Sequence, residues 1–331
     1  MKESDEIKQG NSSIVHFYRD LGYVIKTPKE GVDRQKYMKT QKSASEIMLA
    51  VATRVKEMGV HIDIPSTLSM QNAEIKETIV SGDDFNIDTY KTLDNKTKDK
   101  LAKDLATFMI AMHTMRSPKT VKGMNSEGLL KVELNRLFEK DKKLKEADVE
   151  KQIDKVISVF TDKNVKYFVQ NAVKYVQTKS DTADNILVIR HGDLRDSNIR
   201  YDKNKNCLGI IDFERVAGQD GSIKEGYIYE DFVGSPPSLS WNFMKRVIKH
   251  YNYLSDKLGL GIMINPEKIK QLLIVKIALL AVKNNWSDKE VTQRLNTLGL
   301  MESEKANSFK RGIIKLIEKA NRYRKIDSRG Y

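Results

Sequence analysis

The sequence is poor in the residues that build disulfide or zinc-stapled frameworks. It contains one cysteine, Cys207, and five widely separated histidines among 331 residues. A lone thiol excludes a disulfide framework within the chain and is typical of a protein in a reducing cytosol. The scattered histidines provide no Cys/His metal cluster. With 40% hydrophobic residues, we expect a cytoplasmic protein that folds around its own core.

Long apolar segments are also missing. The longest, residues 272–282, is interrupted by Lys276 and is far shorter than the roughly 20 residues that span a bilayer. The first six residues lack the apolar core of a secretory signal. We therefore expect no membrane insertion, and we predict a buried helix over residues 272–282.

Basic residues are in excess, and they are unevenly distributed. The net charge is +13, and residues 241–331 carry 19 Lys and Arg against 8 Asp and Glu, whereas residues 1–85 are near neutral. A basic face attracts nucleic acid, acidic lipid or phosphorylated substrates. The lysines here are scattered at helical spacing without clustered aromatics, which favours a solvated helical surface and requires no nucleic-acid partner.

Residues 187–214 carry the most specific signal in the chain. They predict an apolar strand, a polar turn with His191 and Asp193, a short strand after Asn198, and a hairpin ending at Asp212. An Asp followed by an Asn and a second Asp at the next strand end can build a phosphoryl-transfer site. Magnesium prefers hard oxygen ligands, and a carboxylate can take the proton of an acceptor hydroxyl.

The alternative is a solvated Asp/Ser/Asn turn between two strands. The hairpin that follows at the expected distance, with its apolar-apolar-Asp ending, favours the catalytic interpretation, because a motif is supported by its structural context.

At these residues the chain resembles the aminoglycoside phosphotransferase and choline kinase family of the protein-kinase-like fold. The catalytic-loop resemblance lies in His191–Leu194 and Asp196–Ile199, and Ile211–Glu214 is similar to the family's metal-binding strand. The resemblance implies an α+β, two-lobed fold, with a small antiparallel β N-lobe over residues 1–82 and a larger, mainly helical C-lobe over residues 83–331. It also implies ATP, or GTP, and Mg²⁺ as cofactors.

The resemblance assigns roles within the loop. It implies that Asp193 is the catalytic base, that Asn198 and Asp212 are the Mg²⁺ ligands, and that His191 is structural. Arg195 departs from the antibiotic kinases, which usually carry a small or polar residue there, whereas protein kinases carry a Lys. We include Arg195 among the catalytic candidates. Stabilising transferred charge, binding an acidic acceptor and a surface position without a role all stay open.

The first 30 residues predict a nucleotide clamp. We expect strands over residues 6–9, 14–19 and 23–26, with a loop at residues 10–13, including Ser12, that covers the phosphates through backbone N–H groups. Lys26 ends the third strand and would reach the α- and β-phosphates, as the similar strand of the family does.

A helix opening at Ser43 carries Glu46, which the resemblance implies pairs with Lys26; a first-turn Glu that complements the helix dipole is the alternative, and Glu57 is a weaker candidate. A hairpin over residues 64–80 leads to the family's hinge. There, backbone groups from Glu77 to Val80, including those of Ile79, are expected to bind the adenine edge.

The remaining segments predict mostly helix. Residues 98–115 form a periodic helix ending near His113, which we expect to be a packing or capping residue. Residues 116–186 are expected to form amphipathic helix, a region that contributes to the acceptor pocket in small-molecule kinases. Asp231 fits the family's acid that braces the catalytic loop, and Pro236–Pro237 precede a helical tail to Tyr331.

These features predict an ATP-dependent phosphotransferase acting on a hydroxyl of a small molecule. The Asp196–Asn198 match favours an aminoglycoside-like acceptor, whereas the basic C-terminal part argues against a polycation. A protein-directed kinase and a nucleotide-binding regulator without turnover remain as alternatives. Nothing in the sequence names the acceptor or the oligomeric state, because fold does not fix substrate.

Overall fold

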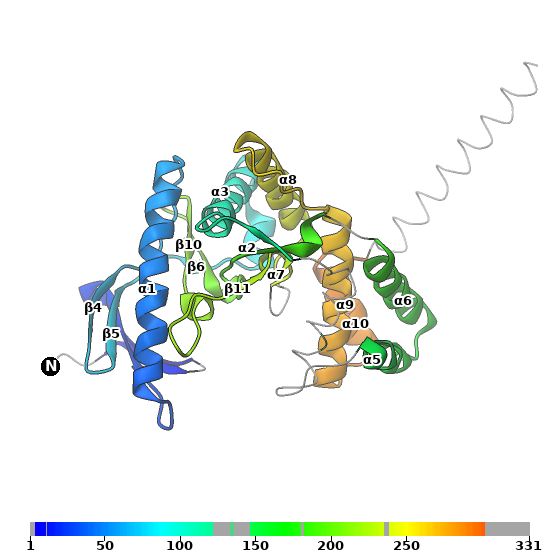
Figure 1. Ribbon diagram of the computed structural model, residues 1–331, viewed down its shortest axis with the longest axis horizontal. Helices are drawn as coiled ribbons and strands as arrows, with labels where there is room; N and C mark the ends of the chain where they lie inside the picture. The colour runs from blue at the N-terminus through cyan, green and yellow to red at the C-terminus, as the bar shows by residue number, and fades with distance from the viewer. Residues whose placement is uncertain are drawn as a thin grey trace, which may run out of the picture.

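The computed structural model describes residues 4–10, 12–121, 134, 146–179, 182–234 and 238–301. Figure 1 shows an N-terminal sheet and a long helix together at the left of the molecule and a larger, mainly helical part at the right. This is the two-part α+β architecture predicted from the sequence, and the fold class is confirmed. The division at residue 82 stays a prediction.

The N-terminal sheet is antiparallel, in the order β1-β2-β3-β5-β4. Its strands are β1 (Glu6–Gln9), β2 (Ser13–Tyr18), β3 (Tyr23–Pro28), β4 (Thr67–Gln71) and β5 (Glu74–Thr78), with the short η1 (Arg19–Leu21) between β2 and β3. Tight turns join β1 to β2 and β4 to β5. The predicted strands are therefore found with small shifts of their ends.

Helix α1 (Arg34–Glu57) lies against this sheet (Figure 1) and begins well before the predicted start at Ser43. Its N-terminus is capped by Asp33, whose carboxylate accepts the N–H groups of Gln35 and Lys36. The first turns are polar, but Tyr37 and Gln41 are buried. The start was missed because these turns lack the apolar spacing that marks a buried helix face.

The segment that connects the two parts of the protein lies beside a hairpin, and residues next to that hairpin belong to the candidate site. Strands β9 (Ile199–Asp202) and β10 (Cys207–Ile210) form a sheet with β6 (Asp83–Asp84), which directly follows the connecting segment. Gly82 has a φ of +99°, and a Cβ there would lie 2.4 Å from the Tyr201 carbonyl carbon. Only glycine fits so close an approach, so the backbone at Gly82 packs directly against this hairpin.

The larger part packs helices around a third small sheet. That sheet has the order β11-β8-β7, from β7 (Lys119–Thr120), β8 (Ile186–Ile189) and β11 (Glu225–Tyr227). Its helices are α2 (Ile87–Thr92), α3 (Asn95–His113), α5 (Glu146–Ser158), α6 (Lys163–Thr178), α7 (Tyr229–Val233), α8 (Trp241–Lys257), α9 (Pro266–Asn284) and α10 (Asp288–Thr297). The short helices η2 (Thr182–Asn185), η3 (Asp196–Asn198) and η4 (Phe213–Val216) lie in the connections.

Helix α9 is the buried helix predicted over residues 272–282. It packs between α6 and α7, and Ile274, Ile277 and Ala278 are almost fully covered. Lys276 is also buried, and its ammonium group donates to the carbonyl oxygen of Gly234. Among the described residues, no helix combines the length and apolar character needed to cross a membrane.

The amphipathic helix predicted over residues 116–186 is found in part, as α5 and α6. Residues 122–133 and 135–145 lie outside the described residues, as do Pro236–Pro237 and the tail from residue 302.

Candidate active site

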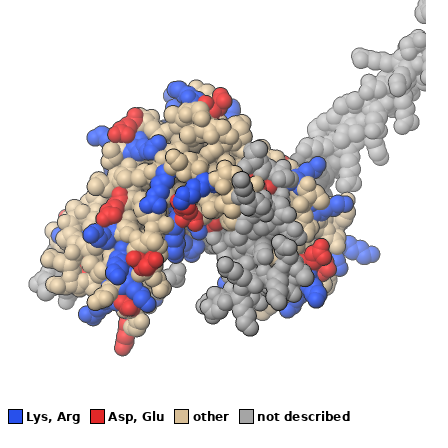
Figure 2. Space-filling model, in the orientation of Figure 1, with Lys and Arg blue, Asp and Glu red and all other residues tan. Residues whose placement is uncertain are grey.

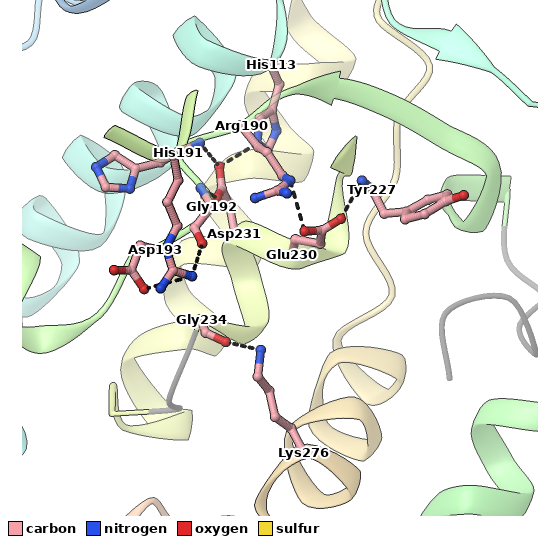
Figure 3. Close-up of polar contacts among 11 residues, drawn as sticks. His113, Arg190, His191, Gly192, Asp193, Tyr227, Glu230, Asp231, Gly234 and Lys276 are labelled. Atoms are coloured by element: carbon pink, nitrogen blue, oxygen red, sulfur yellow. Dashed lines mark hydrogen bonds and ion pairs between the residues drawn. The ribbon is translucent and has the colours of Figure 1, made fainter. Parts of the chain in front are cut away.

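The candidate catalytic loop connects β8 to η3. A single carboxylate accepts hydrogen bonds from the backbone at the start of this loop. Asp231, on α7, accepts the backbone N–H of Gly192 at 2.7 Å and that of His191 at 3.0 Å (Figure 3). Gly192 has a φ of +77°, a conformation that favours glycine. This is the bracing role that the resemblance implied for Asp231.

A buried chain of polar groups holds Asp231 in turn. His113 Nε2 lies 3.2 Å from Asp231 Oδ2, and His113 Nδ1 lies 2.9 Å from the hydroxyl of Tyr251. Burial alone would raise the pKa of Asp231, but the hydrogen bonds with His113 and with the Gly192 N–H contribute to lowering it overall. His113 thus packs and orients the brace, as expected for a histidine at that helix end.

His191 joins the catalytic loop to the strand that ends at Asp212. Its Nε2 lies 3.0 Å from the carbonyl oxygen of Ile211, and its ring packs edge-on against Phe213 with centroids 4.8 Å apart. Burial lowers the pKa of His191, so the ring is neutral at pH 7 and donates to the Ile211 carbonyl. The structural role implied for His191 agrees with this position.

Asp193 is the candidate base, and it is almost fully buried at 3% exposure. The Asn198 side-chain amide donates to the Asp193 carbonyl oxygen at 2.9 Å and to its Oδ2 at 3.1 Å. Asp193 Oδ1 makes no hydrogen bond to the residues that the structure describes. A buried carboxylate oxygen without a donor is suited to accept a proton from a bound hydroxyl.

Asn198 and Asp212 are brought together by one backbone hydrogen bond, from the Ile211 N–H to the Asn198 carbonyl oxygen at 3.0 Å. The Asn198 side-chain nitrogen donates to Asp193, so the amide oxygen is the atom of this side chain that would bind a metal ion. Asp212 adopts the left-handed region, with φ +65° and ψ 65°, a conformation that costs a non-glycine residue about 1–3 kcal/mol and is found at functional sites. The pair supplies the hard oxygen donors that Mg²⁺ requires.

The nucleotide side of the site is centred on Lys26, within β3. Its ammonium nitrogen lies 2.8 Å from Glu77 Oε2, and both side chains are largely buried. Burial alone would lower the pKa of Lys26, but the charge and hydrogen bond of Glu77 raise it overall. Lys26 is therefore a fixed cation inside the N-terminal part, as a lysine that binds phosphates must be.

The predicted partner of Lys26, Glu46, is corrected. Glu46 is exposed on α1, and the carboxylate that binds Lys26 comes from β5. In the sheet, Val24 is paired with Glu77, which places Lys26 and Glu77 on the same face of neighbouring strands. The position of α1 that faces the site is occupied by Gln41, whose amide donates to Glu214 Oε1 at 2.9 Å.

The expected adenine contacts are corrected for the backbone of Glu77 and for the N–H of Ile79, whereas those of the Ile79 carbonyl oxygen and of Val80 stay predictions. Glu77 lies inside the sheet, paired with Val24 on β3 and with Thr67 on β4, so its contribution is the side chain. The N–H of Ile79 donates to the Gly22 carbonyl oxygen at 3.1 Å, so it is not a donor for adenine.

Ser12 contacts the catalytic half directly. Its hydroxyl donates to Glu214 Oε2 at 2.6 Å, so the Ser12 and Gln41 side chains bind the two oxygens of one carboxylate. The phosphate contact predicted for the backbone of this loop stays a prediction.

Sequence reasoning missed three residues of this site, namely Gln41, Glu214 and Arg215. Arg215 NH1 lies 3.5 Å from Asp193 Oδ1, and Arg195 Nε lies 3.5 Å from Asp193 Oδ2. Arg215 could have been identified from its position in the sequence, three residues after Asp212.

No protein-family model matches the sequence, and no curated protein matches it significantly. Solved structures match nearly the whole chain. A GDP and kanamycin complex of APH(2")-IIIa is 16% identical, with a TM-score of 0.53 over 92% of this chain and 95% of that chain. A GDP complex of wild-type aminoglycoside 2'-phosphotransferase-IIIa is 17% identical, with a TM-score of 0.50 over 92% of each chain.

At these identities the likeness establishes the fold. The chain has the protein-kinase-like fold of the aminoglycoside phosphotransferases, as its catalytic-loop residues implied.

Proposed function

We propose that this protein is a phosphotransferase that moves the γ-phosphate of ATP or GTP to a hydroxyl of a small molecule. The observation that carries the proposal is the buried Asp193, whose unbonded Oδ1 lies in the loop that also supplies Asn198 and is joined by a backbone bond to the strand before Asp212. The fold shared with aminoglycoside phosphotransferases supports it. The GDP in both solved relatives is the reason to test GTP beside ATP.

In this proposal each residue has one task. The acceptor oxygen attacks the γ-phosphorus, the bond to the bridging oxygen of the nucleoside diphosphate breaks, and Asp193 Oδ1 takes the hydroxyl proton. Lys26, fixed by Glu77, binds the α- and β-phosphates. Asn198 and Asp212 would hold Mg²⁺, which when bound neutralises phosphate charge.

The test is transfer of labelled γ-phosphate from ATP and from GTP to a panel of antibiotics, choline, sugars and a generic protein. Asp193→Asn should reduce turnover by about 10²–10⁴, the contribution of a positioned base, while nucleotide affinity stays near that of the wild type. Asp88→Asn, at an exposed position of α2, is the matched control and should retain full activity. Near-normal turnover in Asp193→Asn would show that Asp193 is not the base.

A further inference from the structure

Two arginines flank the candidate base, one at each carboxylate oxygen. Arg195 lies 3.5 Å from Oδ2 through Nε, and Arg215 lies 3.5 Å from Oδ1 through NH1. These distances exceed those of good N–H···O hydrogen bonds, and Asp193 Oδ1 and Arg195 Nε have no hydrogen-bonding partner among the described residues. The one hydrogen bond found for either guanidinium joins Arg215 NH1 to the Gly192 carbonyl oxygen at 3.3 Å.

Most of the donors on these two side chains are therefore available to a ligand. A guanidinium group carries five N–H donors in a planar fork that matches carboxylate and phosphate oxygens. The side chains are 32% exposed for Arg195 and 46% exposed for Arg215, so both groups reach solvent beside a base that is almost fully buried.

Four other carboxylates in this region have hydrogen-bonding or ion-pair partners of their own. Asp231 binds the loop N–H groups and His113, and Glu230 pairs with Arg190 at 2.9 Å. Glu214 accepts from Ser12 and Gln41, and an oxygen of Asp196 accepts its neighbour's N–H. Arg195 and Arg215 are the two guanidinium groups within ion-pair distance of the Asp193 carboxylate among the described residues. Figure 2 shows Lys and Arg atoms gathered in the centre of this face, over β11 and α7, with acidic atoms among them.

We propose that the acceptor carries an anionic group, a carboxylate or a phosphate, next to the hydroxyl that is phosphorylated, and that Arg195 and Arg215 bind it. This inference rests on the proposed function. A guanidinium pair holds an anion at the mouth of the site and places the adjacent hydroxyl over Asp193. An acceptor that placed an ammonium group there would meet two like charges instead.

The arginines have a rival role, which is to stabilise the charge of the transferring phosphoryl group. The two roles give different kinetics. Loss of an interaction with the γ-phosphate lowers kcat for every acceptor alike, whereas loss of an acceptor contact raises KM for anionic acceptors and leaves neutral ones little changed.

The test uses compounds that share one ring, namely glucose, glucuronate, glucose 6-phosphate and glucosamine, with kanamycin as a polycation. Labelled-phosphate transfer should favour an anionic member over glucose by at least about tenfold in kcat/KM, since each charge-assisted contact is worth that much. The glucuronate and glucose 6-phosphate arms separate a carboxylate from a phosphate.

Arg195→Gln and Arg215→Gln should each raise KM for the anionic acceptor about tenfold. Arg215→Lys, which keeps the charge, should retain part of the preference, so that a folding defect in the Gln variant does not decide the result. Arg246→Gln, which removes a similarly exposed arginine that pairs with Asp99 on α3, should change nothing.

The outcomes separate the two proposals. Transfer to glucosamine or kanamycin in preference to the anions, or an equal loss of kcat for all acceptors in the arginine variants, overturns the anionic acceptor and keeps the phosphotransferase. Nucleotide binding without transfer to any compound in either panel counts against the proposed function, and the acceptor inference falls with it.

Discussion

At the scale of single residues, most carboxylates of the site are held by hydrogen bonds or by an ion pair. Glu77 binds Lys26, Asp231 binds the loop N–H groups, and Glu214 binds Ser12 and Gln41. Asp193 is the exception, because one of its oxygens accepts no hydrogen bond from the described residues. In the part of the chain that the structure describes, its only close partner is the Arg215 guanidinium at 3.5 Å, and a buried oxygen that lacks a hydrogen bond is the natural acceptor for a substrate hydroxyl.

The pairing of Lys26 with Glu77 makes a prediction about nucleotide affinity. Glu77→Gln removes the charge that holds Lys26, so we expect KM for ATP to rise at least about tenfold, because breaking one partner of a buried ion pair costs several kcal/mol. Glu46→Gln is the control on α1, and it should leave KM unchanged, since Glu46 is exposed. Steady-state kinetics with varied ATP measures both. The reverse ranking would restore Glu46 as the partner.

His191 predicts a pH dependence of stability. Its pKa is lowered in the folded protein because burial disfavours the charged ring. The unfolded chain therefore binds more protons between the lowered pKa and about 6.5, so stability is complete above about pH 6.5 and falls as the pH is lowered through that window.

The slope from one histidine is at most about 1.4 kcal/mol per pH unit. Urea unfolding of the wild type and of His191→Gln at several pH values between 4 and 7 measures it. The variant should lose this part of the slope, whatever its stability at neutral pH. Identical slopes would mean that His191 is protonated in the folded protein.

At the scale of elements, side-chain hydrogen bonds join α1 to the larger part of the molecule. Thr40 donates to the Gly218 carbonyl oxygen at 2.8 Å, and Ser43 donates to that of Gly221 at 2.6 Å. Gln41 lies between them and reaches Glu214. The helix that borders the nucleotide site is thus held by the loop that follows Asp212, and the two halves meet through side chains as well as through the connecting segment at Gly82.

Removing the two hydroxyls should loosen this contact. We expect the double variant Thr40→Val, Ser43→Ala to lose about 1–3 kcal/mol of unfolding free energy, at roughly 0.5–1.5 kcal/mol for each hydrogen bond. Thr53→Val is the control, because the Thr53 hydroxyl bonds only within α1, to the Leu49 carbonyl oxygen. Urea unfolding midpoints compare the three proteins. An equal loss in the double variant and in Thr53→Val would show that the contact adds no stability.

What the sequence could predict depended on how local each signal was. The catalytic loop and the β9–β10 hairpin are fixed by residues close in the chain, and so the order Asp193, Asn198, Asp212 was found. Glu77 lies 51 positions after Lys26, and only the register of β3 and β5 brings them together. Arg215 and Gln41 likewise depend on how loops and helices dock, which neither composition nor periodicity encodes.

At the scale of the whole molecule, the net charge of +13 acts on whatever acceptor approaches. A positive field attracts anions and repels cations, and salt screens both effects, because the Debye length is about 10 Å at 0.1 M and about 3 Å at 1 M. We therefore expect weak or no phosphorylation of kanamycin.

The two kinds of acceptor should also respond to salt in opposite directions. For an anionic acceptor, kcat/KM should fall about three- to tenfold between about 0.05 and 0.5 M NaCl. For a cationic acceptor with any measurable rate, kcat/KM should rise over the same range. Glucose, which is neutral, is the control for direct effects of salt on the enzyme. Micromolar KM values for several aminoglycosides that increase steeply with salt would contradict this expectation, and would mean that the pocket around Asp193 is acidic despite the charge of the molecule.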